Sequence, residues 1–186
     1  YYTAKKIKDI FLGNELRKHF ILKEFDLHNE QINELAQKGK EYTIGTYKRF
    51  KTARNHLSDF LQFKGEKDIV FGAITSQFIH DFEYFLKTRK NISHNTSIRY
   101  IKLFKKIFRI GLRNGWVFKD PFASYQIRFK PVNREHLSLV EIKTIKEKEL
   151  HTERLNQVRD VFIFCCLTGL RYSDVKDLTK NDIHIN

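Results

Sequence analysis

Apolar residues recur at three- and four-residue spacing along most of the chain before residue 120, a pattern typical of helices that each bury one face. Glycines at 39, 65 and 115 follow three of the segments, where helices commonly end in a left-handed residue. The apolar sets of the four segments are Leu16, Phe20, Leu27, Ile32 and Leu35; Phe50, Ala53, Leu57, Phe60 and Leu61; Phe78, Ile79, Phe82, Phe85 and Leu86; and Ile98, Ile101, Phe104, Phe108 and Leu112. The pattern predicts an all-α bundle, with DIVF at 68–71 as one short extended piece.

The only two prolines of the chain, Pro121 and Pro131, bracket a linker-like stretch. After this stretch, Ser138 and Glu141 have the spacing of a capping box, which predicts a helix to about residue 148. Another helix is expected from about residue 154 to 167, closed by Gly169. The chain is therefore expected to divide near residue 130.

The composition narrows the class of partner. Lys and Arg number 35 against 22 Asp and Glu, a net charge of +13 on a chain that is 41% hydrophobic, which points to a polyanion and most simply to nucleic acid. The longest apolar run, 161–167, falls far short of the ~18 residues that a membrane span needs, so no membrane partner is predicted. Cys165 and Cys166 are adjacent and are predicted to be small core residues of a reducing cytosol. No metal or cofactor is predicted, because ligand spacings are absent.

The helix that begins near Asn95 carries a one-sided strip of cations. At ~100° per residue, five basic residues fall within an arc of about 80°, whereas most of the remaining circumference is apolar. The five are Arg99, Lys102, Lys106, Arg109 and Arg113. A solvated face normally mixes signs, and like charges one turn apart repel, so the pattern favours contact with phosphates over a merely soluble surface.

A second candidate for nucleic-acid contact is the helix within YTIGTYKRFKTARNH, residues 42–56. Its polar side chains off the apolar face are Thr46, Lys48, Arg49, Lys51 and Asn55, donors of the kind that contact phosphate oxygens and base edges. Ordinary surface usage explains much of the same pattern. The start of the later helix offers Asn95 or Thr96 as an N-cap beside Arg99, a favourable place for phosphate. Thr46, Arg49 and Asn95 are expected nearest to base edges.

Three stretches together resemble the tyrosine recombinases, the phage-integrase-like site-specific recombinases. TGLRYSD at 168–174 resembles their first catalytic-arginine box, and NTSIRYIKLFKKIFRIGLRNGWVFKDPF at 95–122 resembles the closing helix and exit of their core-binding domain. GTYKRFKTARNHLSDFL at 45–61 is similar to the earlier DNA-facing helix of that domain. The resemblance covers about residues 40–186. The sequence as a whole is similar to integrases of Bacteroides-type mobile elements.

The resemblance implies a SAM-like helical core-binding domain followed by the first helices of the catalytic domain. The implied division is 1–39, an N-terminal helical segment; 40–122, the core-binding domain; 123–136, a linker; and 137–186, the start of the catalytic domain. Arg171 would hold the non-bridging oxygens of the scissile phosphate, because a planar guanidinium pairs with two oxygens at once. Asp174, one helical turn on, would support the arginine rather than perform chemistry.

The resemblance also implies double-stranded DNA as partner, further copies of the recombinase on that DNA, and a bacterial cytoplasm as location. The remaining catalytic residues of the family, a tyrosine nucleophile that takes the 3′-phosphate among them, follow the arginine box and are expected beyond Asn186. The chain, which begins with Tyr1 rather than Met, is thus expected to be a piece of a longer enzyme that binds DNA without cutting it. A non-catalytic DNA-binding regulator or architectural protein is the alternative. An RNA-binding module fits less well, because the aromatics sit at core spacing.

Overall fold

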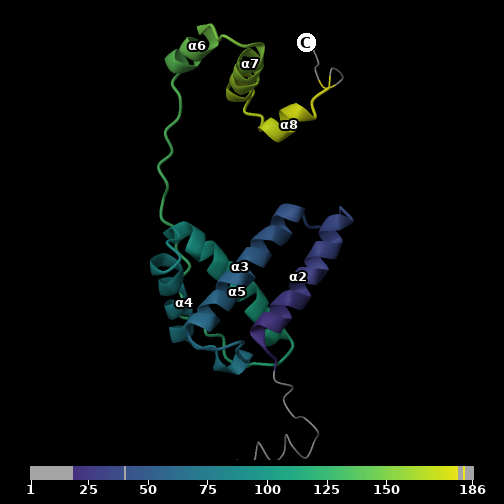
Figure 1. Ribbon diagram of the computed structural model, residues 1–186, viewed down its shortest axis with the longest axis vertical. Helices are drawn as coiled ribbons and strands as arrows, with labels where there is room; N and C mark the ends of the chain where they lie inside the picture. Colours follow the sequence, from purple (N-terminus) through teal and green to yellow (C-terminus); the bar gives the residue numbers. More distant parts are fainter. Residues whose placement is uncertain (1–18, 40, 180–181, 183–186) are drawn as a thin grey trace, which may run out of the picture. The chain divides into compact units, whose positions relative to one another are not determined.

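The computed structural model describes residues 19–39, 41–179 and 182, and these form helices joined by loops (Figure 1). The predicted all-α class is confirmed for this part of the chain. The helices are α2 (Ile21–Gln37), α3 (Ile44–Phe63), the 3-10 helix η1 (Phe71–Ala73), α4 (Ser76–Thr88), α5 (His94–Arg113), α6 (Leu139–Glu147), α7 (Glu153–Thr168) and α8 (Tyr172–Lys176). None of these helices is long and apolar enough to cross a membrane. The chain divides into two compact units, the first of which ends at Pro131 and the second of which begins at Val132.

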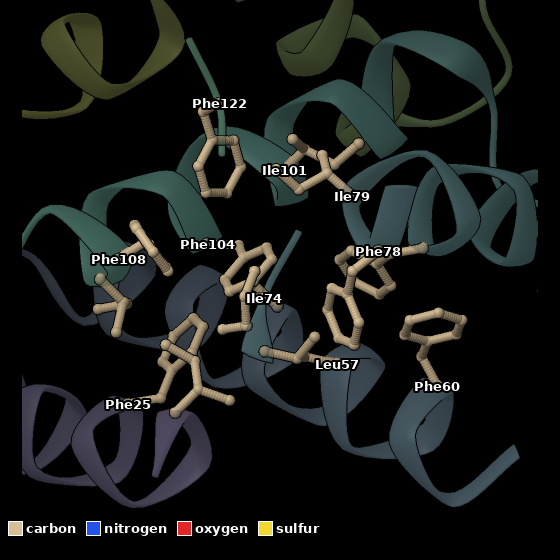
Figure 2. Close-up of a cluster of buried hydrophobic side chains, with 14 of the residues drawn as sticks. Phe25, Leu57, Phe60, Ile74, Phe78, Ile79, Ile101, Phe104, Phe108 and Phe122 are labelled. Carbon is tan, nitrogen blue, oxygen red and sulfur yellow. The ribbon is translucent and has the colours of Figure 1, made fainter. Parts of the chain in front are cut away.

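The first unit is a bundle of α2 to α5 around an aromatic core (Figure 2). The ring centre of Phe60 in α3 lies 5.1 Å from that of Phe78 and 5.4 Å from that of Phe82. The ring centre of Phe104 in α5 lies 5.3 Å from that of Phe122, in the segment that follows α5. Burial of each such ring contributes about 1.5–3 kcal/mol relative to an exposed one. The core therefore joins α3, α4, α5 and the segment after α5 into one folded body.

The buried face of α2 differs from the one that the sequence suggested. Ile21, Phe25 and Ile32 are buried, whereas Leu27 is 45% exposed and Phe20, the residue before the helix, is 36% exposed. At ~100° per residue the buried positions fall within an arc of about 100°, and Leu27 lies on the opposite side. Both faces of α2 carry apolar residues, and packing against α3 and α5 selects one of them. α2, expected in a separate N-terminal segment, thus shares the core of the bundle; Leu16 lies outside the described residues.

The helix ends and the short extended piece agree with the sequence pattern. Gly39, Gly65 and Gly115 have φ between +64° and +78°, so the predicted glycine stops are confirmed. The stretch 68–71 forms an isolated antiparallel bridge, Phe20 with Val70, in which the Ile21 N–H donates to the Ile69 carbonyl at 2.9 Å. The bridge ties the start of α2 to the loop before α4.

A close approach fixes α5 against this loop. Gly111 lies in the last turns of α5, and a Cβ atom at this position would lie 2.5 Å from Cδ1 of the buried Phe71 ring. Real Cβ atoms do not approach that closely, so only glycine fits here unless the ring moves. Phe71 is itself packed against Phe108 and Trp116, at ring-centroid distances of 5.5 and 5.4 Å.

The second unit contains α6, α7 and α8. The predicted capping box is confirmed, since the Glu141 N–H donates to Ser138 Oγ and the Ser138 N–H donates to Glu141 Oε2. α7 ends at Gly169, as predicted, with φ +73°. Ile163 is the one apolar side chain of this unit's described residues that is buried. The prediction of core cysteines is wrong, because Cys165 is half-buried and Cys166 is exposed on a helix with little packed against it.

Candidate nucleic-acid interface

The most exposed residues of α5 are all cations. Of its residues His94–Arg113, those classed as exposed are the five predicted ones, here called the α5 strip: Arg99, Lys102, Lys106, Arg109 and Arg113. The residues facing the bundle, such as Ile101, Phe104 and Phe108, are at most 1% exposed. The predicted one-sided exposure is confirmed. Among the described residues, no ion pair neutralises any member of the strip.

Aromatic rings hold two of these lysines in place. The Lys106 Nζ lies 5.1 Å from the centre of the Phe50 ring and 5.4 Å from that of Tyr42, and the Lys102 Nζ lies 5.5 Å from that of Phe129. A ring face attracts an ammonium group without neutralising its charge, so both lysines keep their full attraction for an anion. Sequence reasoning missed these three rings, because the contacts join residues that are 27 to 64 positions apart.

α3 presents its polar residues on two sides. Arg49 lies on the same side as His56, seven residues on, whose ring centre is 4.8 Å from that of Tyr100 in α5. Lys51 and Asn55 instead line a groove with α2, beside acidic side chains such as Asp26. Arg49 is thus turned toward the α5 side of the bundle, whereas Lys51 and Asn55 are turned toward α2; Lys48 is exposed between them.

The polar side chains at the N-termini of α3 and α5 already have hydrogen-bond partners within the chain. Thr43 caps α3: its Oγ1 accepts from the Thr46 N–H at 3.2 Å and lies 3.1 Å from the Thr46 hydroxyl. Thr46 is half-buried. The expected N-cap of α5, Asn95 or Thr96, is wrong: the helix begins at His94 and Ser93 is its N-cap. Ser93 Oγ donates to Thr96 Oγ1 at 3.0 Å, and the amide of Asn95 is bonded to the backbone of a distant residue.

Two half-buried histidines, His28 and His56, lie close to residues of α5. The His28 ring centre lies 4.8 Å from that of Phe50, and partial burial together with the charge of Lys106 lowers the pKa of His28 to about 4. Burial is also the main cause that lowers the pKa of His56. Both rings are therefore neutral near neutral pH, so the positive charge of this surface comes from Lys and Arg alone.

Arg171 in the second unit is presented from the N-cap position of α8, directly after the turn at Gly169. Its Nε and Nη2 donate to the two Asp174 carboxylate oxygens at 3.0 and 3.1 Å. The hydrogen bonds from Arg171 are the largest cause that lowers the pKa of Asp174, so the carboxylate stays ionised. The Arg171 side chain is 83% exposed. The fork that the sequence expected between these residues is present.

A family model for the phage integrase SAM-like domain matches residues 25–127, which is more than half of the chain. This chain belongs to the phage integrase SAM-like domain family. The match covers the α5 strip, Arg49 and Asn95, and Arg171 and Asp174 lie outside it. Neither a curated protein nor a solved structure matches the chain. In the part of this SAM-like chain that the structure describes, no group of three or more His, Cys, Asp or Glu side chains is arranged to hold a metal ion.

Proposed function

We propose that this chain is the DNA-binding portion of a site-specific tyrosine recombinase, an integrase that breaks and rejoins DNA strands through a 3′-phosphotyrosyl intermediate. The observation that carries the DNA-binding part is the α5 strip, in which every exposed residue of a 20-residue helix is a cation. Residues 40–122 would form the core-binding domain, with α2 of the preceding segment 1–39 packed into its core. Residues 123–136 would be the linker and 137–186 the start of the catalytic domain. Family membership supports an integrase role for the helical unit.

The physical reason for this proposal is the charge balance along the strip. Arg99 and Arg113 are 14 residues apart, so at 1.5 Å per residue the strip extends about 21 Å. Repulsion within the strip costs a few tenths of a kcal/mol for each pair one turn apart. Duplex DNA removes this cost, because its phosphates are spaced closely enough to lie opposite several of these cations at once. Arg49 on α3 would extend the same surface.

The catalytic part of the proposal rests on the presentation of Arg171. Asp174 engages Nε and Nη2, and the described residues offer no hydrogen-bond acceptor to Nη1. The Nη1 side of the guanidinium is thus available to two non-bridging oxygens of a phosphate, while Asp174 fixes the plane of the group. A phosphoryl-transfer transition state gains charge on those oxygens, which this arrangement would stabilise.

The DNA-binding proposal is tested by the salt dependence of duplex affinity, measured by fluorescence anisotropy. The variant Lys102→Glu with Lys106→Glu removes two phosphate contacts, so the slope of log affinity against log salt should fall in magnitude by about 1.8, at ~0.9 per contact. The matched control reverses Lys67 and Lys119, two exposed lysines outside the strip. A slope equal to that of the unaltered chain would remove the strip from the interface.

The alternative function, a non-catalytic DNA-binding regulator, shares the binding result and differs in chemistry. The residues encoded after Asn186 separate the two, because the recombinase proposal requires a tyrosine preceded by a His-x-x-Arg box. A protein extended through that region should form a covalent adduct with a nicked duplex that carries its half-site. If neither the box nor the tyrosine follows, the regulator remains and the recombinase proposal fails.

A further inference from the structure

The segment that leaves the helical unit is fastened to the first turn of α5. The Asn95 Nδ2 donates to the Lys130 carbonyl at 2.9 Å, and the Lys130 N–H donates to Asn95 Oδ1 at 2.8 Å. His94 Nε2 adds a third hydrogen bond, to the Arg128 carbonyl at 2.9 Å. A side-chain amide that pairs with both backbone groups of one residue fixes that residue in position as well as in orientation.

The fastened residues 128–130, here called the strap, read Arg-Phe-Lys. The Nζ of Lys102, in the α5 strip, lies over the Phe129 ring. Because a residue before proline avoids the helical region, Pro131 restricts Lys130 to an extended backbone. Arg128 and Lys130 are both exposed, and among the described residues neither takes part in an ion pair. Figure 1 shows the chain leaving the helical unit beside the start of α5. Two unpaired cations are thus held next to the end of the strip where Lys102 lies.

We propose that the strap is a further part of the DNA-phosphate surface, with Arg128 and Lys130 in contact with backbone phosphates and Asn95 as the positioning residue that holds them. The inference rests on the proposed DNA-binding function of the α5 strip. Cations on a loosely held linker lose conformational freedom when they bind, and the three hydrogen bonds remove part of that loss in advance. Asn95 then acts through the strap, since its amide is already engaged, rather than by contact with a base edge.

The test measures duplex affinity against salt for the full chain and for three variants. Arg128→Gln with Lys130→Gln should reduce the magnitude of the slope by about 1.8, so its affinity should fall roughly tenfold less than that of the unaltered chain over a fourfold rise in salt. Asn95→Ala should give part of the same reduction. Lys67→Gln with Lys119→Gln, a charge-matched control outside the strap, should keep the slope.

Asn95→Ala is also combined with the strap double variant, which separates positioning from base contact. If Asn95 acts through the strap, it lowers neither slope nor affinity further in that background, whereas a base contact would still change the preference between two duplex sequences and would overturn the positioning role. A strap variant with the same slope as the unaltered chain overturns the inference while the proposed function stands. If the unaltered chain shows no salt-dependent binding, the proposed function itself has failed.

Discussion

Replacement of Gly111 by alanine tests the close approach of α5 to the loop before α4. In a helix interior, alanine is favoured over glycine by about 0.8–1 kcal/mol, so helix propensity alone predicts stabilisation. The structure predicts the reverse, because the new Cβ would lie 2.5 Å from the Phe71 ring, and overpacking of a core costs about 1–3 kcal/mol. The sum is a net destabilisation of up to about 2 kcal/mol.

The effect can be read with a probe at the site itself. Trp116 is the only tryptophan of the chain, and its ring centre lies 5.4 Å from that of Phe71. Urea unfolding followed by its fluorescence, with linear extrapolation, therefore reports on this part of the bundle. Gly45→Ala is the matched control, since its Cβ would meet only Thr43 Oγ1 at an ordinary 3.6 Å. That variant should be neutral or slightly stabilised.

A second substitution identifies the cause. In a Phe71→Leu background the ring is gone, so Gly111→Ala should change sign and stabilise the bundle by an amount approaching 1 kcal/mol. If Gly111→Ala stabilises the unaltered chain, or destabilises both backgrounds equally, the argument from the Phe71 contact is refuted.

Three further results are expected. Tyr125 Oη donates to the carboxylate of half-buried Glu83 at 2.5 Å. Burial raises the pKa of Glu83, but hydrogen bonds from Lys87 and from the Tyr125 hydroxyl outweigh burial, so the pKa is lowered. Tyr125→Phe should therefore reduce the free energy of unfolding by about 2 kcal/mol at neutral pH. In urea titrations, that reduction should shrink as the pH falls below the ordinary range of a glutamate and Glu83 becomes protonated in the folded chain, because its lowered pKa stabilises the fold only while the carboxylate is ionised. The pKa of His28 is lowered to about 4, so unfolded chains take up its proton first, and stability should decline from about pH 6.5 toward pH 4. His28→Leu should flatten this thermal-unfolding profile, whereas an unchanged slope would contradict the burial argument. Arg171→Ala should leave anisotropy-measured affinity for non-specific duplex nearly unchanged, because one contact among several is lost.

Much of the local structure of this chain was predictable from its sequence, although the N-cap of α5 was not. Helix ends at Gly65 and Gly169 follow from glycine's freedom at positive φ, and the Ser138 capping box follows from spacing alone. The α5 strip was also visible, because a helix that is apolar around most of its circumference has only one side left for water. Cations such as Lys102 at three- and four-residue spacing must then share that side.

Contacts between distant residues needed the tertiary structure. α2 has apolar residues on two faces, and only packing against α3 and α5 decides that Phe25 is buried and Leu27 exposed. Asn95 has the composition of a cap or a base contact, yet its amide pairs with Lys130, 35 residues away. Periodicity records which residues share a helix face, whereas the partner of that face depends on how the chain closes in space, and no local pattern encodes that closure.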